Sequence, residues 1–483
     1  MSLACPAIQR NNPLSLSTLS RVVVFFIALV FPLIILLLNL AYCVSDYNDY
    51  SEWSNCWLAD AKRIYLDCHG LNFTPPNYPA LGLITSAGAL SLIKLLSGAT
   101  EYPQIREKFQ IYLALFEMAN FILIFLIAQA LNLKRALWIA ALIVVLPSAW
   151  AGGALWTQID VVQQFFLLLC VFFLILTIQW ENVRDPRRTV FLAAGFAGML
   201  AFVLTKQPAI FSLAALAFLL GLAVLKLWKT ESRGTLLTAA VSMLCIATFF
   251  MFLDTRLDVP EGYGGSSYLY MWLGGASSQG SISGNGFNIW MLLGKPMGSS
   301  SKEPFECVSL GTHEVCLTPF HSGLFLYVVY ILGLSAVYSV LCLRLTKHGA
   351  QLENGNTLII ASLLLFLAQS NLGFNVLLAG THERYLYNFY PFLLLSGFYF
   401  YQIGSLSWRS ILFFTVAACS YGGFVYSMHH ELSGFLFAFR RHEFLATIHL
   451  MLMIYLLLFS FSVLQSTTHL AESHSQGLGV SPV

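Results

Sequence analysis

Two aspartates near the start of the chain have the residue type and spacing of a general base. Asp46 and Asp49 stand three residues apart among tyrosines, and Glu52 follows at the same interval. Residues three apart share one face of a helix, so these carboxylates would point in one direction. A carboxylate held against aromatic side chains can take a proton from an attacking hydroxyl. The competing interpretation is an acidic, solvated start to a loop.

Polar groups also interrupt apolar sequence at several later positions. Tyr78 and Pro79 open an apolar run, where proline is tolerated because its missing donor would be unpaired anyway. Pro208 breaks another run shortly after Lys206. Singly these residues have ordinary explanations, because a lysine can extend to water and an acid can stabilise a helix start. The other members of the set are Trp156, Gln158 and Asp160 in one segment and His382, Glu383, Arg384 and Tyr385 in another.

Taken together, these groups suit a reaction at a lipid-linked phosphate ester. Arg holds phosphate oxygens in bidentate geometry and Lys acts as a point charge. Cations and His would stabilise the charge that develops as a glycosyl–oxygen bond breaks, while a carboxylate accepts the proton of the attacking hydroxyl. A donor with a lipid tail would also remove the need for a nucleotide-binding domain, and no polar stretch is long enough to form one.

The composition shows which elements must position these groups. Of the 483 residues, 58% are apolar or aromatic and only 10% are charged, which excludes a soluble enzyme. The 39 Phe and 21 Tyr exclude a disordered chain. A net charge of +2 gives no electrostatic case for binding nucleic acid. The solvent of this protein is therefore mostly lipid.

We predict an all-α, polytopic transmembrane protein that forms a single integral membrane domain over 1–483. The first apolar run is too long for a signal peptide and lacks a cleavage site, so it is a retained helix. About 11 to 13 helices are expected, since roughly 20 apolar residues span a bilayer. The apolar runs are 22–44, 79–97, 109–131, 136–149, 161–180, 189–205, 209–228, 235–253, 322–343, 357–378, 386–404, 410–427 and 445–464.

Lys and Arg in short loops predict the orientation, because such loops face the cytoplasm. They place 1–21 and 465–483 inside, and they place the segments 45–78 and 254–321 outside. All the polar clusters above then fall on the external side, which is the strongest internal argument for one site. The bases that define the inner side are Arg10, Arg21, Arg184, Arg187, Arg188, Lys226, Lys229, Arg233, Arg344 and Lys347.

Three local features leave alternatives open. Lys134 and Arg135 would lie outside if 79–97 and 109–131 both cross, so either one run is a partial span or the pair is an exception. The cysteines of the predicted external loops either form disulfides or stay as thiols; these are Cys56, Cys68, Cys307 and Cys316. The long loop 254–321 reads as lying against the membrane, with short apolar pieces such as 287–293.

Glu117 and Asn120 lie one helical turn apart within the run 109–131. A glutamate inside a membrane is a functional candidate by default, because burying its charge is costly. Hydrogen bonding between helices is the commoner role of such a pair.

At its motifs the chain resembles the GT-C superfamily of integral-membrane glycosyltransferases, which use polyprenyl-phosphate sugars. The resemblance runs from about residue 20 to 400 and is carried by the order of short motifs. Trp156-Thr157-Gln158-Ile159-Asp160 is close to a WGQxD pattern, with Thr157 in place of Gly. Lys206-Gln207-Pro208 resembles a KPQ-type segment with two residues exchanged. The others are the Asp46–Asp49 stretch, Asn77-Tyr78-Pro79, Asn285-Gly286-Phe287-Asn288-Ile289-Trp290 and His382-Glu383-Arg384-Tyr385.

The resemblance implies an inverting transfer, with Asp49 preferred over Asp46 as the base. It implies a polyprenyl-phosphate sugar as donor, a lipid, glycan or protein as acceptor, and a mannosyl or glucosyl group as the sugar. No metal or other cofactor is required, and a divalent metal has no dedicated ligand cluster. The implied host membrane is a bacterial inner membrane, or the ER membrane in a eukaryote. The implied donor-site residues are Tyr78, Trp156, Gln158, Asp160, Lys206, Asn288, His382, Glu383, Arg384 and Tyr385.

Two other functions remain open at this point. A transporter or flippase of a lipid-linked or polar solute would line a path from both sides of the membrane with charges, whereas these clusters sit on one side. A ligase that transfers a whole oligosaccharide from a lipid diphosphate belongs to the same superfamily, and it usually needs a larger external surface.

Overall fold

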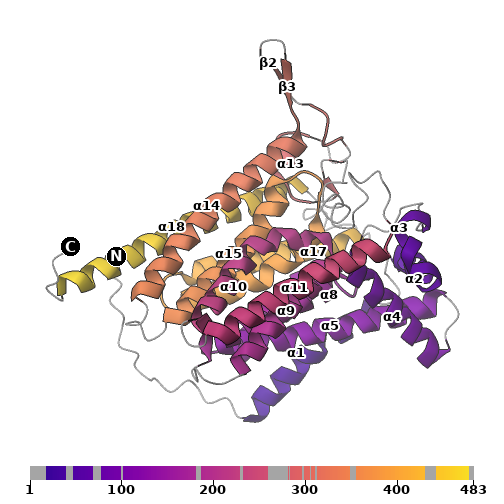
Figure 1. The fold of residues 1–483 in the computed structure, drawn as a ribbon, viewed down its shortest axis with the longest axis horizontal. Coiled ribbons are helices and arrows are strands. Elements are labelled where there is room, and N and C mark those ends of the chain that lie inside the picture. The colour runs from indigo at the N-terminus through magenta and orange to yellow at the C-terminus, as the bar shows by residue number, and fades with distance from the viewer. Residues whose placement is uncertain are drawn as a thin grey trace.

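The computed structural model is a bundle of long helices (Figure 1). It describes most of the chain, and the statements below concern these residues: 18–39, 47–68, 78–98, 102–180, 187–228, 232–258, 281, 283–284, 286–295, 299–304, 306–310, 313–348, 355–429 and 442–477.

Ten helices within the described residues are long and apolar enough to cross a membrane. The protein is therefore an all-α, multi-pass membrane protein, as predicted, and every predicted apolar run contains helix. The helices are α1 Thr18–Asn39, α2 Tyr47–Asp60, α3 Ile64–Asp67, α4 Ala80–Ser97, α5 Tyr102–Ala130, α6 Ala136–Val145, α7 Pro147–Trp150, α8 Asp160–Gln179, α9 Arg187–Thr205, α10 Leu213–Trp228, α11 Ser232–Arg256, α13 Ile289–Leu292, α14 Pro319–His348, α15 Gly355–Leu377, α16 Phe389–Gln402, α17 Trp408–His429 and α18 His442–Gly477.

Short elements adjoin the long helices and bring polar residues to them. Three 3-10 segments are η2 Ala61–Arg63, η3 Gln207–Ser212 and η6 Glu383–Asn388. Strands β1 Ser283–Gly284 and β4 Thr381–His382 pair in parallel, and β2 Glu306–Leu310 pairs antiparallel with β3 His313–Leu317. Pro208 lies in the first turn of η3, so the break that it imposes separates α9 from α10, as predicted.

Helix α15 lies at the centre of the bundle. Nearly all of its residues are buried, and it packs against α16, α14, α10 and α18. Because this helix is buried on all sides, none of its faces is left to contact lipid. By contrast α14 exposes Phe325 and Leu332 on its outer surface, as expected of a helix that faces lipid tails.

One end of the bundle gathers the basic residues and is called the basic end. Arg188 at the start of α9 donates to the carbonyl of Thr177 near the end of α8. Gln179, the last residue of α8, donates to the carbonyl of Ala130 at the end of α5. Lys226 at the end of α10 donates to Asn356 at the start of α15. These contacts bring Arg188 and Lys226, two of the predicted inner bases, to one end.

The position of helix α4 decides at which end of the bundle Lys134 and Arg135 lie. Its first turn lies against α9, because a Cβ at Gly82 would overlap the carbonyl oxygen of Thr205. Its last turn returns to α2, where Lys94 donates to Asn55 over 3.3 Å. Figure 1 shows α4 beside α2 at the end opposite the basic end. The run 79–97 is therefore a partial span, and Lys134 lies at the basic end, where its N–H donates to Gln402.

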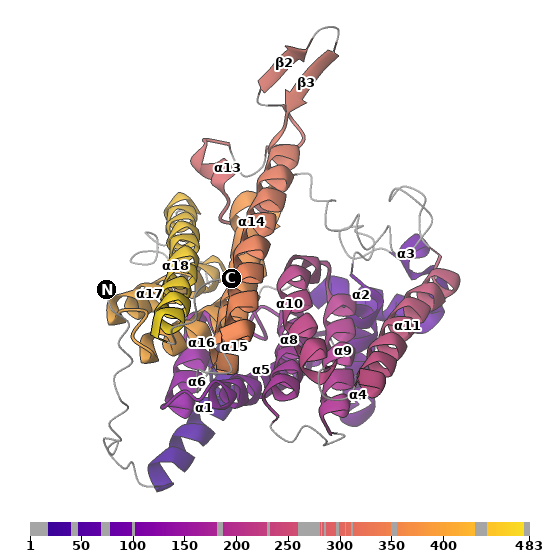
Figure 2. The same cartoon turned by 60° about the vertical axis from the view of Figure 1, so that its left-hand side comes forward.

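The opposite end carries both pairs of loop cysteines as disulfides. Cys56 is bonded to Cys68 beside α2, and Cys307 is bonded to Cys316 across the β2–β3 hairpin. This hairpin extends beyond the start of α14 (Figure 2) and was not predicted from the sequence. The apolar piece 287–293 forms the short helix α13.

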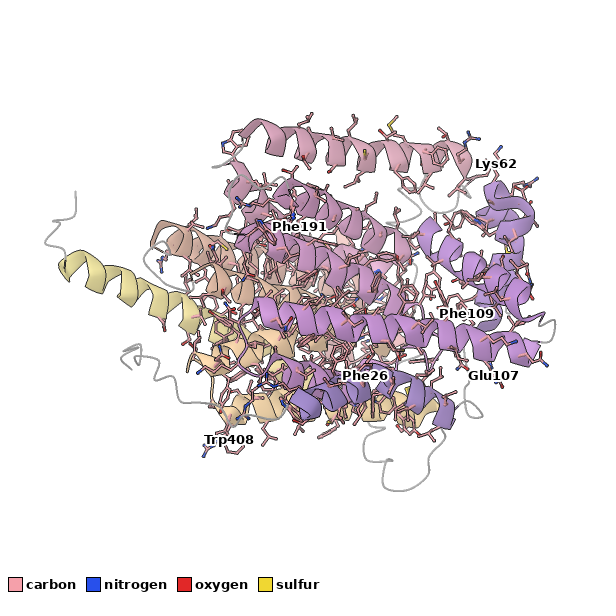
Figure 3. The ribbon with its side chains drawn as sticks, turned by 90° about the horizontal axis from the view of Figure 1, so that it is seen from below. Phe26, Lys62, Glu107, Phe109, Phe191 and Trp408 are labelled. Carbon is pink, nitrogen blue, oxygen red and sulfur yellow. A yellow bond between two sulfur atoms is a disulfide. The ribbon has the colours of Figure 1, made fainter. Side chains whose placement is uncertain are left out.

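The segment that contains α2 and η2 is also tied to a later one at this end. Lys62 in η2 lies 3.7 Å from the carboxylate of Asp258, just past the end of α11. The N–H of Asp258 donates to the carbonyl of Lys62 over 2.8 Å. Figure 3 shows Lys62 beside α11, far from Trp408 at the other end of the bundle. Segments distant in sequence thus frame one end of the molecule.

Candidate functional site

The centre of the candidate site is a buried ion pair between α8 and the α9–η3 junction. The Lys206 ammonium lies 2.5 Å from the Asp160 carboxylate, and the two residues are 1% and 2% exposed. Asp160 is the first residue of α8, where the helix dipole favours a negative charge. Lys206 has extended backbone and precedes η3, and its carbonyl accepts from Gln163. Because a buried charge is tolerated only when paired, each residue holds the other in place.

Two aromatic rings flank the Lys206 ammonium. Its nitrogen lies 5.2 Å from the ring centroid of Tyr78 and 5.7 Å from that of Tyr385. The negative faces of aromatic rings attract a cation at these distances. Tyr78 precedes α4 and Tyr385 lies in η6, so three segments far apart in sequence meet around one charge.

A second set of contacts connects helix α2 to this centre. The hydroxyl of Tyr50 in α2 donates to Gln158 over 3.1 Å and lies 3.1 Å from the hydroxyl of Tyr78. The rings of Tyr50 and Tyr78 are stacked at 5.6 Å, and Tyr65 donates to the carbonyl of Tyr78. The segment after α1 is therefore packed onto the site by aromatic residues.

The segment His382–Tyr385 brings a further cation. The guanidinium of Arg384 lies 5.7 Å from the ring of Trp156, which is largely buried. Glu383 is fully buried at the start of η6, and the His382 ring contacts Tyr385 edge-on. The motif around Asp160 and the motif around Arg384 therefore form a single polar region.

Asn288 belongs to the wall beside that segment. Its side-chain oxygen accepts from the N–H of Met291 and so caps α13, while its amide donates to Thr381. The side chain of Asn375 in α15 donates to the carbonyl of His382 and accepts from the N–H of Phe287. The two motifs that contain Asn288 and His382 are thereby brought side by side.

The turn at residues 153–158 positions Trp156, Gln158 and Asp160. The N–H of Gln158 donates to Gly153 and that of Thr157 donates to Ala154, which is the Schellman pattern of a helix end. Thr157 occupies the left-handed position with a φ of 60°. Glycine is usual there, and a β-branched residue is strained. This geometry explains why the motif that the segment resembles has Gly at this position.

Glu117 fixes the same turn from α5. Its carboxylate accepts from the N–H of Ala154 over 2.8 Å, and a Cβ at Gly153 would overlap it. Gln110 donates to the carbonyl of Leu155 and Asn120 to that of Val161. Glu117 thus makes a hydrogen bond between segments, and the segment that it holds carries predicted site residues.

The predicted bases are only partly within the described structure. Asp46 lies outside the described residues, as does Asn77. Asp49 lies in α2, directly before Tyr50, which contacts Gln158. The assignment of the base to Asp49 stays a prediction.

Sequence reasoning missed several residues that build the site. Tyr50 and Tyr65 did not stand out because they lie in a tyrosine-rich segment. Their spacing from Asp49 along the chain was the signal that could have indicated them. Gln163 and Gln164 are amides within an apolar run, a signal that polar contacts lie there. Tyr387 donates to the carbonyl of Ala149, a contact that no local pattern indicates.

The described residues contain no group of three or more His, Cys, Asp or Glu side chains arranged to hold a metal ion. The independence from metals that the family resemblance implies remains an expectation.

Comparisons with known proteins give similarity of fold. No protein-family profile matches the chain, and no curated protein matches it in sequence. Among solved structures it is similar to the Archaeoglobus fulgidus oligosaccharyltransferase tethered with an acceptor peptide, at 12% identity and a TM-score of 0.42 over 86% of this chain and 55% of that one. The chain thus spans about half the length of that protein.

A second similar structure is ArnT from Cupriavidus metallidurans bound to undecaprenyl phosphate. It is 14% identical, with a TM-score of 0.42 over 96% of this chain and 80% of that one. A third is the archaeal oligosaccharyltransferase AglB with an inhibitory peptide and a dolichol-phosphate, at 12% identity and a TM-score of 0.42 over 93% of this chain and 56% of that one. These likenesses concern the overall fold and assign no residue role.

Proposed function

We propose that the protein is a glycosyltransferase that moves a sugar from a polyprenyl-phosphate donor to a hydroxyl acceptor, at the membrane face opposite the basic end. The observation that carries the proposal is the Lys206–Asp160 pair between Tyr78 and Tyr385, with Arg384 close by. Two cations held by carboxylate and ring contacts are preorganised to meet a phosphate.

The proposed reaction needs few groups. The acceptor oxygen attacks the anomeric carbon of the donor sugar, and Asp49 takes the proton of that hydroxyl. The bond between the anomeric carbon and the phosphate oxygen breaks with inversion, and polyprenyl phosphate leaves. Lys206 and Arg384 stabilise the negative charge that the phosphate gains. Asp160 holds the Lys206 ammonium in position.

Aromatic residues fix the position of helix α2 relative to the cations of this site. The Tyr50–Gln158 bond and the Tyr50–Tyr78 stack join α2, and so the neighbouring Asp49, to the region of the cations. A base on α2 and a phosphate site on Lys206 would then be set at a fixed separation. Proximity of this kind supplies much of the rate enhancement in two-substrate reactions.

The experiment is a transfer assay with purified protein in nanodiscs. Undecaprenyl-phosphate and dolichyl-phosphate carrying mannose or glucose are offered as donors, and release of polyprenyl phosphate is measured with and without acceptor extracts. Asp49→Asn should abolish release while Asp67→Asn, an exposed acid paired with Arg63 in the same loop, should leave it unchanged. Full activity in both Asp49→Asn and Asp46→Asn would remove the proposed base.

Two outcomes would replace the proposal. Consumption of an oligosaccharide-bearing lipid diphosphate, with no use of the monophosphates, would indicate an oligosaccharide ligase. Cysteines introduced beside Asp160 and Glu383 can be probed from each side of sealed vesicles with an impermeant maleimide. Labelling that alternates between the two sides would indicate transport, whereas one-sided labelling supports the enzyme.

A further inference from the structure

Tyr421 in α17 is a buried phenol that the function described so far leaves without a role. The residue is 1% exposed. Within the part of the chain that the structure describes, its hydroxyl has no hydrogen-bond partner. A buried polar group of this kind is rare in folded proteins, because it gives up its bonds to water and gains none in return.

The ring of Tyr421 is fixed by its neighbours. It stacks on Tyr390 at 5.2 Å, and it meets the edge of Phe287 at 6.2 Å. The Tyr390 hydroxyl lies 2.7 Å from Nε2 of His449, whose Nδ1 lies 2.7 Å from the carbonyl of Leu445. Since a carbonyl only accepts, Nδ1 of His449 carries a proton, and the Tyr390 hydroxyl lies between His449 and the carbonyl of Ala417, 3.2 Å away. Ring contacts with Tyr390, which is itself hydrogen-bonded, and with Phe287 therefore hold the Tyr421 ring in place.

The Tyr421 hydroxyl points toward the candidate site. Its oxygen lies 3.8 Å from the position that a Cβ at Gly152 would take, at the start of the segment that carries Asp160. It is also within electrostatic range of Asp160, Glu383 and Arg384. The unsatisfied phenol thus adjoins the residues to which the proposed function assigns the donor.

The charges around Tyr421 indicate which part of a donor it would meet. Of the charged groups within its electrostatic range, Asp160 is paired with Lys206, and Glu383 and Arg384 carry opposite charges. These charges offset one another, so the surroundings of the phenol supply no net positive charge for a phosphate. A sugar hydroxyl is neutral and both donates and accepts hydrogen bonds, so it suits a buried phenol that has no hydrogen-bond partner among the described residues.

We propose that the Tyr421 hydroxyl binds a hydroxyl group of the donor sugar and contributes to sugar selection. This inference rests on the proposed function and deepens it, because it separates a sugar subsite at Tyr421 from a phosphate subsite at Lys206. A site built to bond a substrate hydroxyl rejects an analogue that lacks it, since the buried partner then stays unpaired.

The test compares two lipids on one variant. One lipid is undecaprenyl phosphate, and the other is undecaprenyl-phosphate mannose or undecaprenyl-phosphate glucose, whichever the wild type binds better. The affinity for each lipid is measured in nanodiscs for the wild type and for Tyr421→Phe. The variant should bind the sugar-bearing lipid about tenfold more weakly, the effect of one hydrogen bond, and the sugar-free lipid equally well. Its melting temperature without lipid should be unchanged or higher, because the substitution removes an unsatisfied group.

Tyr390→Phe is the matched control. It removes a hydroxyl that is bonded within the protein, so it should lower the melting temperature and change the affinities for both lipids by the same factor. An equal loss for both lipids in Tyr421→Phe would place the contact at the phosphate and overturn the sugar subsite. A lower melting temperature in that variant, or no change in either affinity, would overturn it as well.

The two proposals fail differently. Wild-type protein that binds none of these lipids would contradict the proposed function, and the sugar contact with it. Wild-type binding that Tyr421→Phe leaves unchanged would contradict the Tyr421 proposal alone.

Discussion

Two turns of this chain close with the same backbone hydrogen bonds at opposite ends of the bundle. At the basic end, the N–H groups of Asn132 and Leu133 donate to Gln129 and Ala128. At the site end, those of Thr157 and Gln158 donate to Ala154 and Gly153. The left-handed residue of the first turn is Asn132, at a φ of 54°, and that of the second is Thr157.

The two turns differ in how they are held. Asn tolerates the left-handed region, and Asn132 is exposed, so the turn at the basic end needs little support. Thr157 is strained and fully buried, and its turn is fixed by the Glu117 carboxylate. Strain that surrounding contacts maintain is typical of functional sites. The turn that carries Asp160 is therefore held in its conformation by its neighbours.

The cations of the two ends differ in the same way. At the basic end, Arg188 and Arg344 donate to backbone carbonyls, and Lys226 donates to an amide oxygen. At the site end, Lys206 meets a carboxylate and two rings. Cations of the first kind bond to uncharged oxygens of neighbouring helices, whereas the second kind is preorganised around a charge.

The largest expected effect contrasts a lysine from each end. Lys206→Met should lower transfer by about a hundredfold or more, because it removes charge stabilisation at the phosphate. It should also destabilise the protein by about 3–5 kcal/mol, since Asp160 stays buried without its partner. Lys226→Met should change both quantities little. Initial rates and thermal unfolding in detergent measure the two effects.

The double variant Asp160→Asn with Lys206→Met separates folding from chemistry. It should regain most of the lost stability while transfer stays low. A fully active Lys206→Met protein would show that the two ends do not differ in function.

A smaller effect contrasts the side chains that fix the two turns. Glu117→Leu leaves the buried N–H of Ala154 without an acceptor and should cost about 1–3 kcal/mol. Gln402→Ala removes bonds to Lys134 and Asn132 at the basic end, where water can replace them, and should cost less. Hydrogen exchange at residue 154 should accelerate only in the first variant.

Glu117→Gln is the control for shape, because the amide keeps an oxygen that can accept. It should retain most of the protection at residue 154. Equal protection in Glu117→Leu and wild type would contradict the role of Glu117 in holding the turn.

The smallest effect contrasts the two left-handed residues. Thr157→Gly should stabilise the protein by up to about 1 kcal/mol, because relief of the strained φ exceeds the entropic cost of glycine. Asn132→Gly should change the free energy of unfolding by only about a few tenths of a kcal/mol, since asparagine already tolerates the conformation. Thermal unfolding of both variants under one condition provides the comparison, and a destabilised Thr157→Gly protein would show that the threonine side chain has an unseen stabilising contact.

Much of the fold follows from local sequence. Runs of about 20 apolar residues must form helices in lipid, because only a helix bonds all its backbone groups within one segment. The break at Pro208 and the sharing of one end by Arg188 and Lys226 were predictable for similar local reasons. The sequence could not show that α4 is a partial span, because its length and composition satisfy the requirements of a full one.

The site was predictable as a set of residues and unpredictable as a geometry. The sequence by itself determined that Tyr78, Asp160, Lys206 and Arg384 interrupt apolar segments, and a charge in lipid must find a partner. Only the tertiary structure decided that Lys206 pairs with Asp160, that Glu117 accepts from Ala154, and that Tyr421 adjoins them. Partner choice depends on which helix ends meet, and that depends on packing between segments up to hundreds of residues apart.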